Sequence, residues 1–572
     1  MLFLSEFSYD YVLKLRVSYA KRRYKDRTYT TPLVVTSYRD ANGTPRNKTL
    51  ASLAKLPSFL VDLIDRALRL GNSDVWKQYV HVEELKHLGS LVVGPVYVVL
   101  SLLRQLGLSD LLRSCLSLKQ AAAILAIVVE RVIAAKPLSV MALQRRFAGE
   151  PLAHLMGLEK SPALKTWYAA LAELEKHRES ILQALYRRNH TPGQLYLYDI
   201  TSSYFEGDCC ELAAFGYNRD GKKGKKQVVV GIICEERGCP IWEDVYQGNT
   251  SDQTTIHQQL LNLRDKLGVE EFTFVGDRGM VTHTRIQELG EEGWWESFRY
   301  ITALTREEMM ALVEDEEHPV QLELFDHENL VEVEQDGTRY VLCHNRQRME
   351  RDAETRQRLL AATEAKLESI RNNVAAGRWK KKEVIARRLY RWINRWGMER
   401  FFEVRYEEGR FSYSRREAEI ARYARLDGCY VIRSNAEHWK QTTEQLRDRY
   451  KDLKYVEQAF RTMKTTDIQM RPIRHFHEAP VRGHIFACFL AYRVVWELRQ
   501  RWEPMLRRNP RTQHCEAGSL AEIWRDLSTV TLATLSANGK TFFKLSQVRP
   551  YVQKLLTLAK IPSLEELERP SE

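Results

Sequence analysis

The stretch Leu195-Tyr-Leu-Tyr-Asp199-Ile-Thr-Ser-Ser-Tyr-Phe-Glu-Gly207 decides the fold. Apolar and aromatic β-forming residues surround a single carboxylate, Asp199, and the run ends at a glycine, so it predicts a central strand. A carboxylate inside a buried strand has a desolvation cost that protonation, a hydrogen-bond donor or a bound cation must offset. The strand therefore predicts a site around Asp199 that other acids could share.

A second acid follows another apolar run. Residues 272–276, Phe-Thr-Phe-Val-Gly, predict a strand, and Asp277 comes directly after it. In open α/β sheets, ligands bind at the carboxyl ends of strands. Asp277 is therefore a candidate partner of Asp199.

A third acid lies on a predicted helix. Residues 450–464 contain no Gly or Pro, and Tyr450, Glu457 and Lys464 recur at intervals of seven. Seven residues are close to two helical turns, so the three side chains are expected on one face. That face would offer a phenol and an ammonium to phosphate beside the carboxylate.

Together, Asp199, Asp277 and Glu457 form a plausible oxygen-ligand set for Mg²⁺, with Mn²⁺ as a substitute. Hard divalent cations prefer carboxylate oxygens. Two such ions roughly 3.5–4 Å apart clamp the attacking and leaving oxygens of a phosphodiester. The expected cofactor is therefore two Mg²⁺ ions per active site.

With these residues the chain resembles a bacterial insertion-sequence transposase of the DDE type. Asp199, Asp277 and Glu457 match the triad, and Tyr450 and Lys464 match the outer residues of a Tyr-Arg-Glu-Lys signature. The signature's Arg is replaced by Leu453; Lys454 and Arg449 are the nearby cations. Other matching motifs are Asp199-Ile-Thr-Ser-Ser-Tyr, Gly216-Tyr-Asn-Arg-Asp220, Lys226-Gln-Val-Val-Val-Gly231, Gly248-Asn-Thr-Ser-Asp252 and Asp277-Arg-Gly-Met280. They cover about 190–305 and 428–500, and together they are specific.

The resemblance implies Mg²⁺-dependent cleavage at the element's ends, followed by strand transfer into target DNA. Asp199 would bridge both ions, while Asp277 and Glu457 would each hold one. Tyr450, Lys464 and Arg278 would position phosphates. The partners implied are transposon-end DNA and target DNA, and a homodimer is expected in the DNA synapse.

The resemblance also implies the fold class: α/β, with an RNase H-like catalytic core, a mixed β/helical insertion within it, and a mainly helical N-terminal DNA-binding region before it. Predicted strands over 228–234, 240–246 and 298–303, with a helix from 252 to about 267, follow the order of such a core. The expected domains are 1–60, a basic β-hairpin module; 61–190, a helical region that binds DNA ends; 191–304 with 428–500, the core; 305–427, the insertion; and 501–572, a helical region and tail.

Basic segments outside the core are candidate DNA contacts. Residues 1–60 hold eleven Lys or Arg against four acids, with a hairpin turn expected at Asn42-Gly43. In the insertion, β character is expected over 320–325, 330–334 and 339–343, followed by helices. A helix over 379–396 carries Arg387, Arg391 and Arg395 on one face, which suits strand binding, and Trp392 and Trp396 on another, where core packing explains them.

Composition agrees with a DNA partner without deciding it. The net charge of +12 favours a polyanion. The nine cysteines include no Cys-x-x-Cys, so a zinc ribbon is not indicated and reduced, cytosolic thiols are expected. The resemblance implies a bacterial, cytoplasmic protein that is nucleoid-associated when bound to DNA. The start lacks signal-peptide features, and no membrane partner is expected. His475, His477 and His484 have no cysteine at ligand spacing, so a zinc site is not favoured. The resemblance implies that His484 opens the next packed helix, where its role is structural.

Two other functions stay open. An RNase H-like nuclease would cut without transferring strands. An inactive or domesticated copy would bind terminal repeats as a repressor or architectural protein, and Leu453 is the one hint of it. End cleavage and strand transfer distinguish the three. Neither the terminal-repeat sequence nor the target preference follows from the sequence.

Overall fold

The computed structural model describes residues 15–24, 27–40, 42–70, 85–158, 160–189, 195–207, 209–278, 280–291, 293, 298–318, 320–321, 324, 330–394, 397–438, 440–507, 515–537 and 540–568. The chain divides into two compact units, which are Met1–Leu91 with Thr531–Ser546 and Leu564–Glu572, and Val92–Val530 with Gln547–Ser563. The three candidate acids lie in the second unit.

An antiparallel sheet of three strands opens the first unit. The strands are β1 (Leu15–Tyr24), β2 (Arg27–Arg39) and β3 (Pro45–Ser52), in the order β1-β2-β3. Between β2 and β3, the Asp40 carboxylate accepts hydrogen bonds from the backbone N–H groups of Asn42 and Thr44, both at 3.0 Å. Gly43 takes a φ of +75°, which glycine adopts without steric cost. The hairpin expected at Asn42-Gly43 is therefore confirmed.

The first unit also contains a helix and a second sheet. The helix α1 (Ser58–Leu70) packs on the first sheet through Val17, Leu53 and Val61. The second sheet has the order β16-β15-β4. Its strands are β4 (Lys86–Val92), β15 (Thr531–Ala537) and β16 (Lys540–Leu545). Two distant parts of the sequence thus build one sheet.

The second unit begins with a helical layer. Its helices are α3 (Gly94–Gln105), α4 (Leu108–Cys115), α5 (Leu118–Ile133), α6 (Val140–Arg146), α7 (Pro151–Leu155), α8 (Leu164–Lys176) and α9 (Arg178–Asn189). The helical pattern expected up to residue 190 is confirmed from α3 onward, while β4 before it is a strand. The long helix α18 (Glu478–Arg501) packs against α5 and α8. Among the described residues no single helix has the length and hydropathy to cross a membrane, although the bent pair of α3 and α4 meets both criteria jointly.

Close packing explains the glycine in α18. A Cβ on Gly483 would lie 1.9 Å from the backbone carbonyl oxygen of Leu171 in α8. No larger residue fits between the two helix backbones without displacing one of them. This close contact fixes the position of α18 on the helical layer. It therefore also fixes the segment that directly precedes α18.

An eight-stranded sheet forms the centre of the second unit, in the order β10-β11-β14-β9-β8-β5-β6-β7. Its strands are β5 (Leu195–Tyr204), β6 (Gln227–Glu235), β7 (Pro240–Gln247), β8 (Phe272–Gly276), β9 (Phe298–Ala303), β10 (Val331–Gln335), β11 (Thr338–His344) and β14 (Cys429–Ser434). The first three form an antiparallel meander, whereas β8 and β9 run parallel to β5. The register pairs Tyr198 of β5 with Gly276, the last residue of β8. Asp199 is the next residue of β5, and Asp277 directly follows β8. The strands expected over 228–234, 240–246, 272–275 and 298–303 are confirmed.

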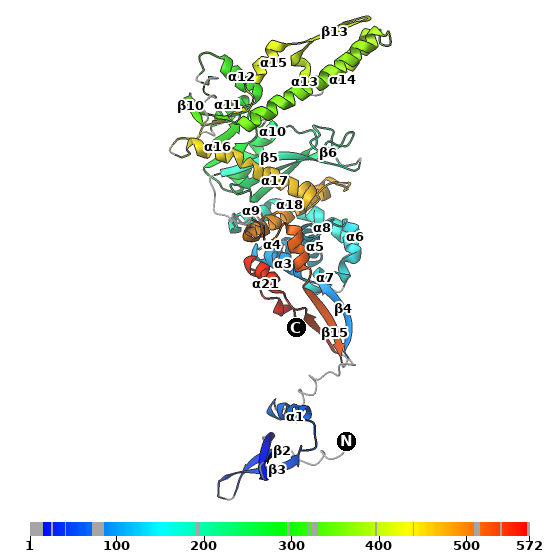
Figure 1. The fold of residues 1–572 in the computed structure, drawn as a ribbon, viewed down its shortest axis with the longest axis vertical. Coiled ribbons are helices and arrows are strands. Elements are labelled where there is room, and N and C mark those ends of the chain that lie inside the picture. The colour runs from blue at the N-terminus through cyan, green and yellow to red at the C-terminus, as the bar shows by residue number, and fades with distance from the viewer. Residues whose placement is uncertain are drawn as a thin grey trace. The chain divides into compact units, whose positions relative to one another are not determined.

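The segment between β9 and β14 contributes to this sheet and also has its own core. Strands β10 and β11 continue the central sheet through β14. The described residues Val320, Gln321 and Leu324 lie in no strand, so the strand expected there is not formed by them. The remaining elements are α12 (Arg306–Glu314), α13 (Arg346–Ala375), α14 (Lys382–Ile393), β12 (Phe402–Glu407), β13 (Arg410–Arg415) and α15 (Glu417–Ala424). Figure 1 shows α13 and α14 side by side, and their apolar faces share one buried cluster.

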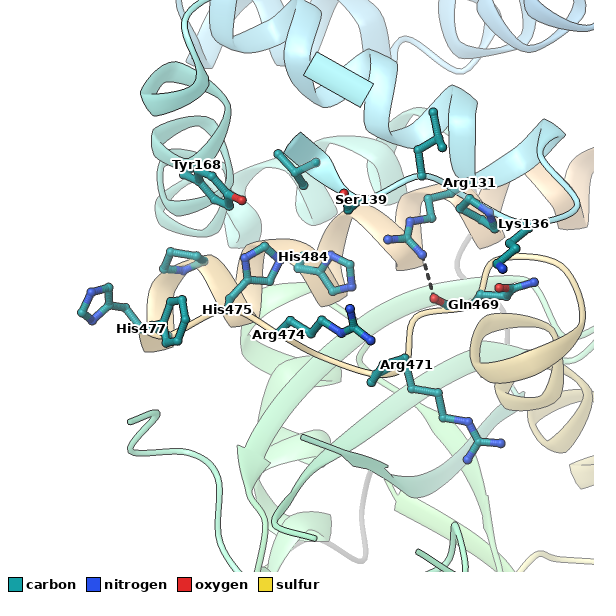
Figure 2. Close-up of a pocket in the computed structure, with 16 residues that line it drawn as sticks. Arg131, Lys136, Ser139, Tyr168, Gln469, Arg471, Arg474, His475, His477 and His484 are labelled. Atoms are coloured by element: carbon teal, nitrogen blue, oxygen red, sulfur yellow. Dashed lines mark hydrogen bonds between the residues drawn. The ribbon is translucent and has the colours of Figure 1, made fainter. Parts of the chain in front are cut away.

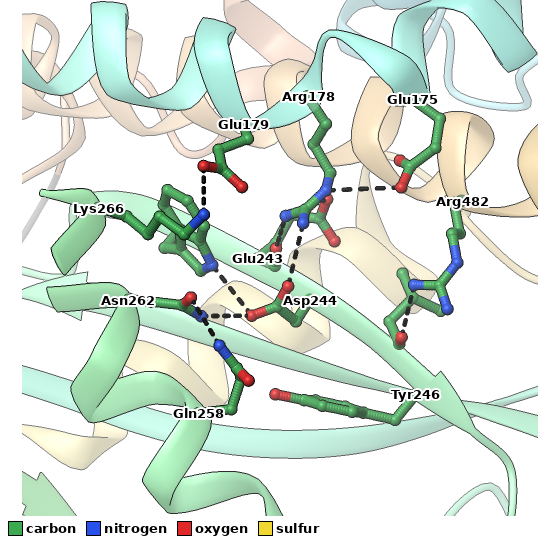
Figure 3. Close-up of polar contacts among 12 residues, drawn as sticks. Glu175, Arg178, Glu179, Glu243, Asp244, Tyr246, Gln258, Asn262, Lys266 and Arg482 are labelled. Atoms are coloured by element: carbon green, nitrogen blue, oxygen red, sulfur yellow. Dashed lines mark hydrogen bonds and ion pairs between the residues drawn. The ribbon is translucent and has the colours of Figure 1, made fainter.

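A buried ionic cluster joins the helical layer to strand β7 (Figure 3). Arg178, at the start of α9, pairs with Asp244 at 3.2 Å and with Glu175 at 3.6 Å. Glu243 is fully buried 3.8 Å from the same guanidinium, and burial raises its pKa to about 8. Because Trp242 and Asn262 also donate to Asp244, at 3.0 and 2.8 Å, the cluster ties helices and sheet together with directional bonds.

Candidate active site

One cavity of about 440 Å³ contains all three acids predicted from the sequence. Asp199 comes from β5, Asp277 from the loop directly after β8, and Glu457 from α17 (Leu453–Arg461). The parallel pairing of β5 with β8 places the two aspartates next to each other. Asp277 and Glu457 are exposed, and Asp199 is half-buried.

The electrostatics of Asp199 differ from those of an ordinary surface acid. Burial raises its pKa to about 7, and the negative charge of Asp277 acts in the same direction. Its Oδ1 accepts a hydrogen bond from the N–H of Ile200 at 2.7 Å, and Arg219 also favours the ionised form. Burial and a neighbouring acid that disfavour the charge of Asp199 make a site at which a cation or a proton is favoured.

Asp277 is held by two donors. The backbone N–H of Arg278 donates to its Oδ1 at 2.8 Å, and the Tyr450 hydroxyl donates to the same oxygen at 3.3 Å. Burial, together with the charge of Asp277, raises the pKa of Tyr450, so the phenol stays protonated and acts as a donor. Tyr450 therefore orients this carboxylate in the structure.

The helix expected over 450–464 is broken, which corrects the prediction of a single face. α16 (Thr443–Lys451) ends at Asp452, α17 follows, and Thr462–Thr466 form a π-helical turn. Tyr450 and Glu457 both line the cavity, but Lys464 does not. Glu457 follows the break and still lines the cavity, whereas Lys464 lies in the π-helical turn, which departs from 3.6 residues per turn, so an interval of seven does not place it beside Glu457.

Lys464 is engaged elsewhere. Its Nζ lies 2.7 Å from the carboxylate of Asp220 and donates to Thr201 Oγ1 at 2.8 Å. Arg471 also pairs with Asp220, whose side chain is 2% exposed. The Lys464 ammonium thus binds a buried carboxylate next to Thr201, which is two residues from Asp199 on β5. Its contact with DNA stays a prediction. The sequence shows the motif that contains Asp220, but it gives no sign of this pairing.

The position of the missing signature arginine is apolar. Leu453 is buried in the wall of the cavity. Of the two cations suggested as substitutes, Lys454 lines the cavity with an exposed side chain, whereas Arg449 lies 3.9 Å from Glu236 and does not line it. Lys454 is therefore the better substitute.

The structure adds cavity residues that the sequence did not indicate. Arg348, in the first turn of α13, lines the cavity together with Lys451 at the end of α16. Asn345 caps α13 by accepting a hydrogen bond from the Arg348 N–H at 3.0 Å, and the Arg348 guanidinium lies 5.9 Å from the centre of the Tyr430 ring. No local motif marks Arg348, because it is brought to the acids by the pairing of β11, which precedes α13, with β14.

Of the remaining predicted DNA contacts that the structure describes, one lines the cavity of the acids and two do not. Arg278 is exposed and lines the cavity. Arg387 and Arg391 are exposed on α14 and do not line it, while Arg395 and Trp396 lie outside the described residues. Trp392, expected in the core, is half-buried. The Lys366 ammonium lies 4.8 Å from the centre of its ring.

The three acids are candidate oxygen ligands for a hard divalent cation. In the part of the chain that the structure describes, no three His, Cys, Asp or Glu side chains are clustered closely enough to hold a metal ion. The chemistry nevertheless fits, because the adjacent carboxylates of Asp199 and Asp277 supply oxygen ligands, and a cation would offset the burial that disfavours the charge of Asp199. Glu457 reaches the same cavity from the facing helix.

Comparisons with known proteins agree with the resemblance that the motifs predict. Residues 17–73 match the model of the N-terminal domain of the IS1634 transposase family. The chain resembles an insertion-sequence transposase. No curated protein sequence matches it significantly.

Similar solved structures include the piggyBac transposase synaptic complex with hairpin DNA, at 10% identity and a TM-score of 0.35, over 79% of this chain and 73% of that one. The Mos1 transposase paired-end complex with the left transposon end matches at 14% identity and a TM-score of 0.13, over 32% and 74% of the two chains. The Mos1 strand transfer complex matches at 13% identity and a TM-score of 0.14, over 34% and 75%.

Proposed function

We propose that this chain is a DNA transposase that cuts DNA at the ends of an insertion sequence and joins those ends to target DNA. The observation that carries the proposal is the shared cavity. It brings Asp199, Asp277 and Glu457 together from a strand, a strand end and a helix that are far apart in the sequence. The family match at residues 17–73 supports the same class of activity independently.

The strand order supports an RNase H-like catalytic core. In the resembled family, three antiparallel strands are followed by two that run parallel to the first, and the first and fourth lie side by side. Strands β5 to β9 follow this order. The segment between β9 and β14, with its own apolar core, supports an insertion into that core.

In this proposal Asp199, Asp277 and Glu457 hold Mg²⁺. When bound, the metal stabilises charge on the phosphate oxygens and lowers the pKa of the attacking water or 3′-hydroxyl. Asp199 supplies an oxygen from the rigid centre of the sheet, and Tyr450 fixes the orientation of the Asp277 carboxylate. The protein thus pre-organises the carboxylates and needs no covalent intermediate with DNA.

The cations around the acids suit the backbone of the bound strand. Arg278, Arg348, Lys451 and Lys454 line the cavity, and the side chains of all four are exposed. Lysine and arginine at such positions neutralise phosphates and place the scissile bond without reading its sequence. Because transposition joins two ends, we expect two copies of the chain to assemble on DNA.

The test uses a labelled duplex that carries the element's terminal repeat, incubated with Mg²⁺ or EDTA. Metal-dependent cleavage at the end is expected for the wild-type chain and should fall by at least about 1,000-fold in Asp199→Ala, Asp277→Ala and Glu457→Ala. Asp265→Ala is the matched control, because this acid is exposed in the same unit and does not line the cavity.

Two outcomes would replace the proposal. Cleavage without joining to a second DNA would indicate a nuclease that only cuts. Binding of the terminal repeat with no cleavage, unchanged by the three substitutions, would indicate an inactive DNA-binding copy. The buried Leu453 at the position of the signature arginine is the observation that favours this second candidate.

A further inference from the structure

A second cavity, of about 600 Å³, lies outside the acidic site in the second unit. It opens between the helical layer, at Arg131 of α5 and Tyr168 of α8, and the segment 469–484 that leads into α18 (Figure 2). None of the three candidate acids lines it. Its volume falls within the roughly 300–1,000 Å³ that small-molecule sites occupy.

The charged side chains that line this cavity are cations, and two of them pair with acids outside the lining: Arg471 with Asp220, and Arg474 with Glu206 at 3.5 Å. Arg131, Lys136, Arg471 and Arg474 line it, and no Asp or Glu is among its described lining residues. The Arg131 guanidinium donates to the backbone carbonyl of Gln469 at 2.7 Å, which fixes the two sides of the opening against each other (Figure 2). A cavity with cations and no lining acids favours an anion.

Aromatic side chains lie among the cations of this cavity. Tyr168 and Phe476 line the cavity and are 39% and 64% exposed, so part of each side chain is accessible to a ligand. The ring of His475 packs edge-on against Tyr168 at 6.0 Å, and burial lowers the pKa of His475 to about 4, which keeps this ring neutral. Exposed aromatic rings beside cations are the surfaces on which nucleic-acid bases stack.

A buried acceptor also faces this region. His484 lines the cavity and is 4% exposed, and its Nε2 lies 3.1 Å from the carbonyl oxygen of Met470. That carbonyl can only accept, so Nε2 carries the proton and Nδ1 is left as an acceptor. Within the described residues, Nδ1 has no hydrogen-bond partner. A small donor that enters the cavity would satisfy it.

We propose that this cavity binds one unpaired nucleotide of a DNA strand. The base lies against Tyr168 and Phe476, and its phosphate is bound by Lys136 and Arg474. The ligand chemistry is a flat heterocycle with N–H donors, joined to a phosphate, which matches the rings, the cations and the unpaired acceptor. The identification of the strand as DNA rests on the proposed function.

The position of the cavity relative to the acids supports a nucleotide of the same strand. Arg471 lines the cavity and pairs with Asp220, which also binds Lys464. Lys464 in turn donates to Thr201, two residues from Asp199 on β5. A continuous chain of contacts therefore leads from the acids to the cavity.

The probe is a 12-nucleotide single strand of thymidines with one central 2-aminopurine, whose fluorescence is quenched when the base stacks. The full-length chain is titrated in EDTA, and quenching is expected to saturate with binding. Phe476→Ala and Tyr168→Ala should abolish most of the quenching and weaken binding about 10-fold each. Phe476→Tyr, which keeps the ring, should restore both.

The cation contribution is measured in parallel. Lys136→Ala should reduce the slope of log affinity against log salt by about 0.7, the value for one phosphate of a single strand. Lys165→Ala is the matched control, because this exposed lysine lies on α8 and does not line the cavity. Thermal unfolding of each variant establishes that it is folded.

Quenching and affinity that survive in both Phe476→Ala and Tyr168→Ala would overturn the proposal. Displacement of the probe by equimolar deoxyadenosine monophosphate would overturn the strand as the source and assign the cavity to a free nucleotide. Because the titration contains no metal and measures no cleavage, its outcome does not depend on whether end cleavage is observed.

Discussion

At the residue scale, Lys464 shows how burial changes the role of a charged side chain. From the sequence it is a DNA contact, but the structure pairs its ammonium with Asp220, and only 11% of the lysine side chain and 2% of the aspartate side chain are exposed. Removing one partner of a buried pair leaves an uncompensated charge. The primary effect of Lys464 is therefore expected on folding.

Lys464→Ala should reduce the free energy of unfolding by about 3 kcal/mol, because Asp220 keeps only Arg471 as a charged partner among the described residues. Urea denaturation measures the change. Lys454→Ala, on an exposed side chain of the neighbouring helix, should change it by less than about 0.5 kcal/mol. Equal stability of the two variants, with DNA binding abolished only in Lys464→Ala, would show that the lysine serves DNA instead.

Metal binding is also a residue-scale question. A divalent cation at 100 times its dissociation constant should stabilise the folded chain by about 2.7 kcal/mol if it does not bind the unfolded chain. We expect Mn²⁺ to raise the unfolding temperature of the wild-type protein in the absence of DNA. The shift should disappear in Asp199→Asn and in Asp277→Asn. A shift that persists in both variants would place the metal elsewhere.

At the element scale, the contact of α18 with α8 depends on one missing side chain. Gly483→Ala would place a Cβ 1.9 Å from the carbonyl oxygen of Leu171, and backbone cannot rotate away as a side chain can. We expect a loss of about 2 kcal/mol or more, measured by denaturant unfolding. Gly149→Ala is the control, because its Cβ would meet nothing within 4 Å. Wild-type stability in Gly483→Ala would contradict this packing.

The ionic cluster between α9 and β7 should make stability depend on pH. Burial raises the pKa of Glu243 from 4.5 to about 8, so the folded chain keeps a proton that the unfolded chain releases above about 4.5. The contribution of this group to the free energy of unfolding therefore falls as pH rises from about 4.5 to 8.

Glu243→Gln should remove this dependence on pH. Between about pH 5 and pH 8, the free energy of unfolding of the wild type should fall by on the order of 3 kcal/mol more than that of the variant. Unfolding in urea across this pH range measures it. An exposed acid that forms only a surface pair, such as Asp265, provides the control substitution to Asn. Parallel pH profiles for wild type and Glu243→Gln would exclude a raised pKa at this position.

At the scale of the whole molecule, the net charge of +12 predicts DNA binding that weakens steeply with salt. Arg22 and Arg23 are exposed on β1, within the segment that matches the transposase N-terminal domain. Replacing both by Ala should lower the slope of log affinity against log salt by about 1.8, which is about 0.9 for each phosphate that is no longer neutralised. Filter binding or anisotropy on terminal-repeat duplex measures the slope.

Arg405→Ala is the control for an exposed arginine outside the N-terminal sheet, since its side chain is 81% exposed and pairs with Glu403 at 2.7 Å. The double variant Arg22→Ala/Arg23→Ala should differ from it in slope. If the two behave alike, the basic N-terminal sheet does not contact the DNA ends.

Much of the second unit follows from local patterns. The strands of the central meander and β8 and β9 alternate or run apolar between turn residues. The bounds of β6 to β9 agree with the prediction within about one residue, whereas β5 ends at Tyr204, before the predicted stop at Gly207. The prediction of one continuous helix through 450–464 is wrong, because propensity carries no signal for the change of direction at Asp452. The domain boundaries given from the sequence stay predictions.

By itself, the sequence determined the residue types and the order of the acids: a carboxylate within a strand, one at a strand end and one on a later helix. Local chemistry is sufficient for this, because strand propensity and the cost of a buried charge depend on a few neighbouring residues. Only the tertiary structure decided which cations surround them. Arg348 is brought to the cavity by the pairing of β11 with β14, and Lys464 forms an ion pair with the buried Asp220. Such contacts join residues far apart in the chain, and no local pattern contains them.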